Sequence, residues 1–167
     1  MVLSRKSCPV PLEQQPLEEY NTLILSNFFA LPAQAMRFYL FCLFLLSILL
    51  TLFASLLFIP DSLSYYMNWC HLLTVLIASD IIVILLIARL YFSWSYVSKR
   101  LLSAIVFYEE SGWYDGQIWV KTTDVLIQDR LIAINVSIPL INRIKFSVFA
   151  FLIKVLIETI LYVYLIE

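Results

Sequence analysis

The sequence predicts a mostly α-helical membrane protein, with three transmembrane helices and a small membrane-side domain made of helices and a β-hairpin. Three observations predict this class: 62% of the 167 residues are hydrophobic, only 14% are charged, and three long segments hold almost no charge. The mean hydropathy is +0.91. Soluble domains are about 45–50% apolar and about 25% charged. The balance of 11 Lys and Arg against 12 Asp and Glu also argues against a nucleic-acid-binding protein.

The first predicted transmembrane helix covers residues 38–59, which contain no charged residue. About 20 apolar residues at ~1.5 Å each cross the ~30 Å hydrocarbon core, and a helix satisfies its own backbone hydrogen bonds there. The second and third predicted helices, residues 69–92 and 146–166, each contain two charged residues. Both are otherwise dominated by Leu, Ile, Val and Phe, and aromatic residues mark their ends, as at membrane interfaces.

The positions of the cationic residues predict the orientation of these helices. The short loop at residues 60–68 has no Lys or Arg, whereas residues 1–37 and 93–145 carry several. By the positive-inside rule, residues 60–68 form an outer loop. Residues 1–37 and 93–145 then share the cytoplasmic side or its organellar equivalent, and the C-terminus lies on the opposite side.

The N-terminal region, residues 1–37, is predicted to be a Pro-rich strap followed by an amphipathic helix. Three prolines between Cys8 and Tyr20 favour an extended course, since each proline fixes its own φ and restricts the residue before it. Two interpretations stay open for this strap: a disordered tail, or a docking segment that lies over the protein's own membrane-side domain or over a partner. The helix is expected over residues 17–31.

Residues 93–145 form the predicted membrane-side domain, beginning as a helical continuation of the second span. Two β-prone runs, residues 105–110 and 117–121, flank Ser-Gly and Asp-Gly turn signals and predict a hairpin with a longer loop. A helix is expected to start near Thr122 and to be interrupted at Pro139. From Pro139, suited to a first helical turn, one helix is expected to run into the third span.

Several specific motifs resemble those of a known family. They are Cys8-Pro9-Val10-Pro11, Trp94-Ser95-Tyr96-Val97, the block from Phe107 to Gln117, and Asp129-Arg130-Leu131. In these motifs the chain is similar to the hypothetical chloroplast open reading frame thirty-six family of cyanobacteria and plastids, over residues 8 to about 145. The resemblance implies a multi-span protein of the photosynthetic membrane, plastid-encoded in algae. The family has no established biochemical activity, so no catalytic residue is carried over.

Three ionisable residues lie inside the predicted spans: Asp80, Lys154 and Glu158. Charged groups in mid-membrane are costly and usually face a partner or a cavity. The predicted orientation puts Asp80 and Lys154 near the same depth, and Lys154 and Glu158 are four residues apart on one helical face. Three interpretations stay open: an ionic clamp between helices, a path for protons or ions, and a contact with another subunit or cofactor.

Other candidate ligands do not form a recognisable site in the sequence. His71 stands beside a single cysteine, which is too few ligands for a zinc or iron site. Glu109, Glu110 and Asp115 are either a cation site or, as is commoner for hairpin carboxylates, solvated. The sequence has no phosphate-binding Gly-rich loop, Ser-His-Asp set or HExxH motif. No metal or catalytic site is therefore predicted, and the sequence names no cofactor.

These observations favour a non-enzymatic accessory or assembly factor of the thylakoid membrane of the plastid. Its expected partners are the lipid bilayer and a photosynthetic membrane complex, with no nucleic acid. Aromatic side chains are enriched at binding hot spots, and four of them are predicted to contact the complex: Tyr108, Trp113, Tyr114 and Trp119. The alternative is a small oligomeric transporter or membrane-embedded enzyme that uses Asp80, Lys154 and Glu158.

Overall fold

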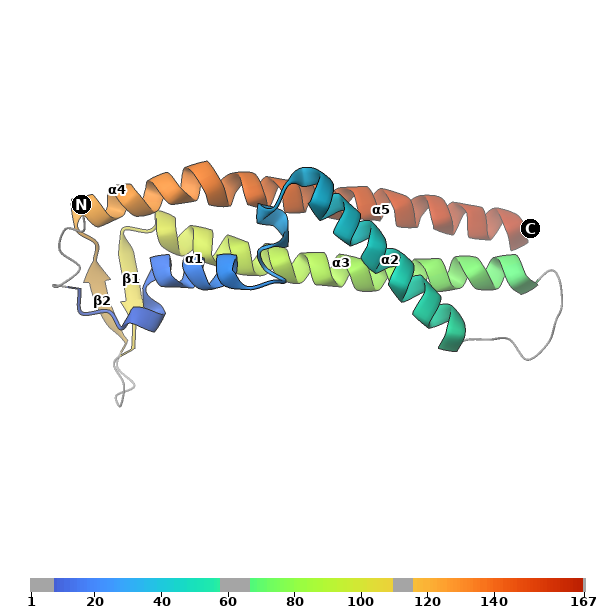
Figure 1. The fold of residues 1–167 in the computed structure, drawn as a ribbon, viewed down its shortest axis with the longest axis horizontal. Helices are drawn as coiled ribbons and strands as arrows, with labels where there is room; N and C mark the ends of the chain where they lie inside the picture. Colours follow the sequence, from blue (N-terminus) through green and yellow to red (C-terminus); the bar gives the residue numbers. More distant parts are fainter. Residues whose placement is uncertain (1–7, 58–66, 110–115, 167) are drawn as a thin grey trace. The chain divides into compact units, whose positions relative to one another are not determined.

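The computed structural model describes residues 8–57, 67–109 and 116–166, and Figure 1 shows the course of the chain. The chain forms two compact units, each built from segments far apart in the sequence. We call them the hairpin unit, Met1–Ala30 with Phe92–Ile141, and the three-helix unit, Leu31–Tyr91 with Asn142–Glu167. Two long helices, α3 (Met67–Leu102) and α5 (Ile138–Ile166), contribute residues to both units.

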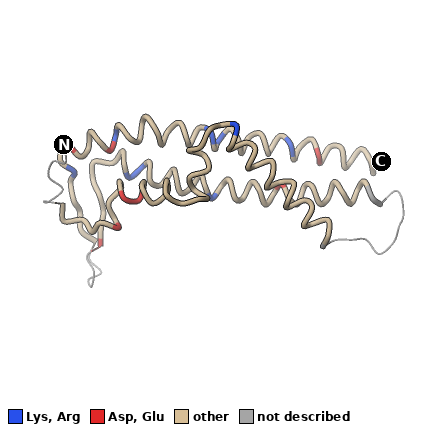
Figure 2. Tube along the Cα trace, in the orientation of Figure 1, with Lys and Arg blue, Asp and Glu red and all other residues tan. Residues whose placement is uncertain are grey.

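In the three-helix unit, α2 (Met36–Leu57) packs with the parts of α3 and α5 that belong to this unit. Among the described residues, three stretches are long and apolar enough to cross a membrane: Met36–Leu56, Trp69–Leu102 and Thr123–Ile166. Charges are sparse along them, and α2 carries its one charge, Arg37, in its first turn (Figure 2). The outward face of α2 is apolar, because Phe44 and Phe53 are about two-thirds exposed, at 64% and 60%.

The predicted helices are present, with bounds that differ at their ends. Helix α2 begins at Met36, two residues before the predicted span at 38–59, whose last two residues lie outside the described part. Helix α3 continues past residue 92 to Leu102, which confirms the predicted helical continuation. Of the predicted outer loop, residues 60–66 lie outside the described residues, and residues 67 and 68 already belong to α3.

The predicted hairpin is present in the hairpin unit. Strands β1 (Ile105–Tyr108) and β2 (Gln117–Val120) pair antiparallel, with Ile105 opposite Val120 and Phe107 opposite Ile118. Side chains of a strand point alternately to opposite faces. Val106 and Tyr108 are accordingly buried, while Ile105 and Phe107 are exposed.

The N-terminal segment of the hairpin unit contains a 3₁₀ turn, Leu12–Gln14, and helix α1, Pro16–Leu25. Pro16 occupies the first turn, where its missing N–H has no helical partner to lose. The prediction that this helix reaches residue 31 is wrong, because Ser26 already has an extended backbone at φ −77°, ψ 130°. The chain leaves the helix there, and the Phe29 carbonyl accepts a hydrogen bond from Trp94 Nε1 at 2.9 Å.

Pro139 does not break the helical course, so the predicted interruption at this residue is wrong. Helix α4 (Thr123–Ile132) passes through a π-helical turn, Ala133–Ser137, directly into α5. The Ile138 N–H bonds to the carbonyl of Ala133, five residues back. Proline cannot donate the usual bond to the residue four positions earlier. A widened turn just before it lets the chain continue as helix.

Candidate functional site

The three ionisable residues predicted inside the spans come together in the three-helix unit, and we call them the charge triad. Lys154 Nζ on α5 donates a hydrogen bond to Asp80 Oδ1 on α3 at 2.9 Å and lies 2.8 Å from Oδ2. The same ammonium lies 3.6 Å from Glu158 Oε1, one turn along α5. Asp80 is fully buried and Glu158 is 8% exposed, whereas 44% of the Lys154 side chain is accessible. One lysine therefore serves two buried carboxyl groups.

A pair of hydroxyl groups connects α2 to α3 at the residue that directly precedes Asp80. Thr51 Oγ1 on α2 and Ser79 Oγ on α3 are 2.9 Å apart, and Ser79 directly precedes Asp80. Both hydroxyls also bond to backbone carbonyls of their own helices, Thr51 to Ser47 and Ser79 to Leu76. The contacts between α2, α3 and α5 are therefore polar at this level, although the helices are apolar outside.

An apolar cavity of about 330 Å³ lies between α2 and α5 and reaches Lys154. Leu40, Leu43 and Phe44 line it from α2, and Phe146, Ala150 and Phe151 from α5. Its polar lining residues are Ser47, Ser147 and Lys154. The cavity therefore borders the lysine of the charge triad.

The hairpin unit contains a second lysine paired with a buried carboxylate, and this lysine is itself buried; sequence reasoning missed it. Lys121 Nζ lies 2.6 Å from Asp129 Oδ2 on α4, and the side chains are 0% and 4% exposed. The ammonium also donates to the carbonyls of Arg100 and Leu101, at 2.9 and 3.2 Å. These carbonyls belong to the last turn of α3, where the helix has no further N–H donors and favours a cation. Lys121 thus ties β2, α3 and α4 together.

The Pro-rich strap lies over the protein's own hairpin unit, one of the two predicted interpretations. The Gln14 side-chain amide pairs with the Glu109 backbone in both directions, donating to its oxygen at 3.0 Å and accepting from its nitrogen at 2.9 Å. Arg100 donates to the Gln14 carbonyl at 2.9 Å and forms an ion pair with Glu19. Val10 packs into a cluster with Val106 and Tyr108. The strap is therefore part of this unit.

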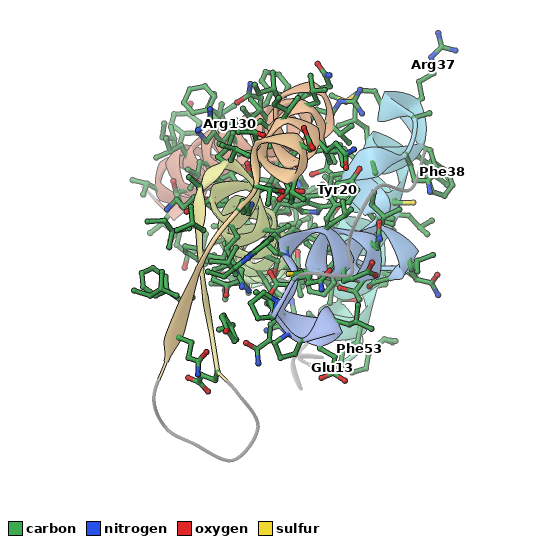
Figure 3. All side chains as sticks on the ribbon, turned by 90° about the vertical axis from the view of Figure 1, so that its left-hand side faces the viewer. Glu13, Tyr20, Arg37, Phe38, Phe53 and Arg130 are labelled. Carbon is green, nitrogen blue, oxygen red and sulfur yellow. The ribbon has the colours of Figure 1, made fainter. Side chains whose placement is uncertain are left out.

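Two titratable groups of α1 are shifted by their burial. Burial raises the pKa of the Glu19 carboxyl above its ordinary value, and the Arg100 guanidinium offsets this only in part. Burial also raises the pKa of Tyr20, whose ring meets Trp94 edge to face with centroids 6.1 Å apart. Figure 3 shows Tyr20 pointing in among the helices, while Arg37 and Phe38 point away from α2.

The predicted aromatic contact residues fall on different sides of the hairpin. Tyr108 is 6% exposed and its hydroxyl donates to Gln117 Oε1 at 2.7 Å, so its ring is part of the cluster beneath the hairpin. The structure therefore places the Tyr108 ring inside the unit, and its contact with a partner stays a prediction. Trp119 is half-buried and packs against the same cluster. Trp113 and Tyr114 lie outside the described residues.

The opposite face of the hairpin carries exposed aliphatic and aromatic side chains. Ile105, Phe107, Ile118 and Val120 are 43%, 69%, 61% and 64% exposed, and they form two directly opposed pairs across the strands. We call these four residues the hairpin face. Successive side chains of a strand point to opposite faces. The members of the hairpin face therefore follow from the sequence as soon as Val106 and Tyr108 are known to point inward. Of the three acidic hairpin residues, Glu109 contacts Gln14 through its backbone, whereas Glu110 and Asp115 lie outside the described residues.

These features define a mostly helical protein with three candidate membrane-spanning helices and a small antiparallel hairpin. Within the described ranges, no three His, Cys, Asp or Glu side chains form a group that could hold a metal ion. The family described as CGLD27-like, Conserved in the green lineage and diatoms 27, matches residues 8–150. The chain belongs to this family. The predicted resemblance to the hypothetical chloroplast open reading frame thirty-six family is confirmed by this match together with the ycf36 relatives described next.

Relatives of the chain include proteins of algal species. It is 47% identical over 145 residues to the uncharacterized protein ycf36 of Cyanophora paradoxa, covering 83% of this chain and 87% of the relative. It is 45% identical over 150 residues to the uncharacterized protein ycf36 of Porphyra purpurea, covering 87% and 88%. The Arabidopsis thaliana protein Conserved in the Green Lineage and Diatoms 27, chloroplastic, is 53% identical over 64 residues, which are 38% of this chain and 20% of that protein. No solved structure matches the chain.

Proposed function

We propose that this protein is a non-enzymatic accessory or assembly factor of the thylakoid membrane. In this proposal the three long helices span the bilayer, and the hairpin unit on the stromal side binds a photosynthetic membrane complex. Two findings support the location: the length and apolar composition of the helices, and the chloroplastic designation of the Arabidopsis relative.

The hairpin face is the observation that carries the proposal. A protein surface in water seldom has four large apolar side chains side by side unless they contact a partner, because their exposure to water is energetically unfavourable. The strap and the Lys121–Asp129 ion pair hold the other face of the hairpin, so the exposed face is presented on a fixed support. Trp113 and Tyr114 belong to the connection between β1 and β2 and are proposed to extend the same contact.

The partner is expected to be a protein complex, and co-purification tests this. The full-length protein, tagged in its own membrane, is purified in mild detergent as wild type and as Phe107→Ser with Ile118→Ser. This cross-strand pair is one of the two pairs of the hairpin face, and both side chains are exposed. We therefore expect the variant to insert normally and to lose its co-purifying proteins. Retention of every partner by a normally inserted variant contradicts the proposed contact.

A matched control separates this contact from a general effect of apolar surface. Ile127→Ser with Leu131→Ser changes two side chains of α4 with similar exposure, 57% and 54%. We expect this control to keep its partners. If both double variants lose the complex equally, the binding surface is not confined to the hairpin. If wild type co-purifies with lipid but with no other protein, and the hairpin variant loses that lipid, the face contacts lipid and the proposed protein partner is wrong.

The alternative function, a small oligomeric transporter or membrane-embedded enzyme, has one observation in its favour: Asp80, Lys154 and Glu158 meet at one place. Uptake measurements with the protein in sealed liposomes test it. Transport that is lost on Lys154→Met and kept in the hairpin variant favours this alternative over an accessory role.

A further inference from the structure

The charge triad holds an excess of negative charge when all its members are ionised. Two carboxylates, Asp80 and Glu158, lie within 2.8 and 3.6 Å of the ammonium of Lys154. One cation therefore faces two anions at a place where three apolar helices meet. A buried charge without a partner is expensive, and more so within a bilayer.

Other charged groups on the three helices are too far along their axes to balance this excess. The next charged residue toward the end of α3 is Arg89, about 14 Å from Asp80 at ~1.5 Å per residue. On α5, Lys145 is about 14 Å from Lys154 by the same measure. The remaining titratable side chain of α5 within about one turn of Glu158 is Tyr162. Helix α2 contributes hydroxyls near the triad, and its one charged residue, Arg37, lies in its first turn, about 21 Å along the helix from Thr51 at ~1.5 Å per residue.

The hydrogen bonding at the triad is also incomplete. Glu158 Oε2 is buried and has no hydrogen-bond partner among the described residues. Asp80 Oδ2 likewise receives no aligned hydrogen bond, although it lies close to the Lys154 ammonium. Asp80 Oδ2 and Glu158 Oε1 approach the same Lys154 ammonium, at 2.8 and 3.6 Å, so the two carboxyl groups lie close together. Two carboxylates cannot bond to each other unless one of them carries a proton, since neither otherwise has a donor.

We infer that the charge triad binds one exchangeable proton, shared between Asp80 and Glu158, at neutral pH. This proton makes the triad electrically neutral and supplies the missing donor between the two carboxyl groups. Closely spaced carboxyl pairs elsewhere behave in the same way, because like charges at short distance do not both ionise. The apolar cavity between α2 and α5, with its two serine hydroxyls, reaches Lys154 and offers a route by which the proton exchanges. The site is independent of the hairpin face.

Infrared spectroscopy of the full-length protein in lipid nanodiscs tests the inference directly. A protonated carboxyl group has a carbonyl stretch that carboxylates lack, and this band shifts when the proton is exchanged for deuterium. We expect wild-type protein at neutral pH to show this band. Glu158→Gln and Asp80→Asn should each abolish it, because either change leaves one carboxylate matched to one lysine.

Two further variants fix the assignment. Lys154→Met should increase the band, because the two carboxyl groups then lack their cation and take up a further proton. Glu13→Gln is the matched control, since it removes an exposed carboxylate of the N-terminal segment and should leave the band unchanged.

The wild-type spectrum alone can overturn the inference, even if every variant fails to fold. Absence of the band at neutral pH overturns the inference, and so does a band that persists in both Glu158→Gln and Asp80→Asn. If the band is absent but sodium alters the carboxylate stretches of wild type and not of Glu158→Gln, the triad binds a metal cation and the inference is wrong.

Discussion

Lys121 in the hairpin unit and Lys154 in the three-helix unit both pair with a buried carboxylate, but their surroundings differ. Lys121 has one carboxylate, Asp129, and two backbone carbonyls of α3 as acceptors, and its side chain is 0% exposed. Lys154 has two carboxylates and a side chain that is 44% exposed. The first arrangement balances charge and directs the lysine protons to fixed acceptors, whereas the second leaves a negative excess and a buried oxygen without a donor.

The difference separates a structural ion pair from a candidate for proton chemistry. A fully satisfied buried network rigidifies the elements that it joins, while a partly satisfied one is unstable in its ionised form and responds to protonation. Burial of a charge therefore does not by itself identify a functional site. A structural ion pair and a functional candidate are distinguished by whether the charges balance and whether every buried polar atom has a hydrogen-bond partner.

The largest effect is expected from Lys121→Met. It leaves Asp129 as an uncompensated buried charge and removes the donor from two carbonyls of α3, so the free energy of unfolding of the hairpin unit should fall by about 3–5 kcal/mol. Chemical unfolding in detergent, followed by tryptophan fluorescence, measures this, since Trp94 and Trp119 lie in this unit. Lys99→Met, a change of an exposed lysine of α3, is the control. Lys121→Met with Asp129→Leu should recover much of the loss; no recovery would mean that the two residues are not coupled.

The three-helix unit should respond asymmetrically to changes in its charges. Lys154→Met removes the partner of two carboxyl groups and should lower stability by about 2–3 kcal/mol, less than Lys121→Met because protonation relieves the charge left behind. Asp80→Asn leaves Lys154 paired with Glu158 and should lower stability by about 1 kcal/mol. Thermal unfolding in nanodiscs compares the two. Equal losses would contradict the shared role of Lys154.

A smaller effect is expected where the strap meets the hairpin. Gln14→Ala removes two hydrogen bonds to the Glu109 backbone, and since these are exposed, a loss of about 1 kcal/mol is expected. Limited proteolysis should then cleave the strap sooner. Glu13→Ala, at the exposed neighbouring position, should leave the cleavage rate unchanged. If the two variants are cleaved alike, the Gln14 amide does not hold the strap.

The smallest effect concerns the pH dependence that Glu19 confers on the hairpin unit. Burial raises the folded-state pKa of this carboxyl above its ordinary value of 4.5, so the folded protein holds the proton to a higher pH than the unfolded chain. The stabilising contribution is full below 4.5 and is lost as the pH rises through the folded-state pKa. Unfolding midpoints across this range should fall with pH in wild type, and less in Glu19→Gln. A midpoint that rises with pH, and rises more steeply in wild type than in Glu19→Gln, would contradict the raised folded-state pKa of Glu19.

The long helices and the hairpin were predictable because their signals are local. An uncharged run such as residues 38–59 has one stable form in lipid, and two β-prone runs around Gly-containing turns favour a hairpin. The end of α1 at Leu25 and the helical passage through Pro139 were not predictable. The first depends on where the Phe29 carbonyl meets Trp94, and the second on a π turn that absorbs the missing donor.

Among the site residues, the sequence alone determined that Asp80, Lys154 and Glu158 are costly in an apolar segment and are expected to meet, because charge and hydrophobicity are properties of the chain itself. It also placed the chain in its family through its motifs. The tertiary structure alone decided that one lysine serves two carboxyl groups, that Lys121 binds the end of α3, and that Tyr108 points inward while Phe107 points outward. The partners of a buried charge and the face of a strand depend on which distant segments pack together, and no local pattern records that.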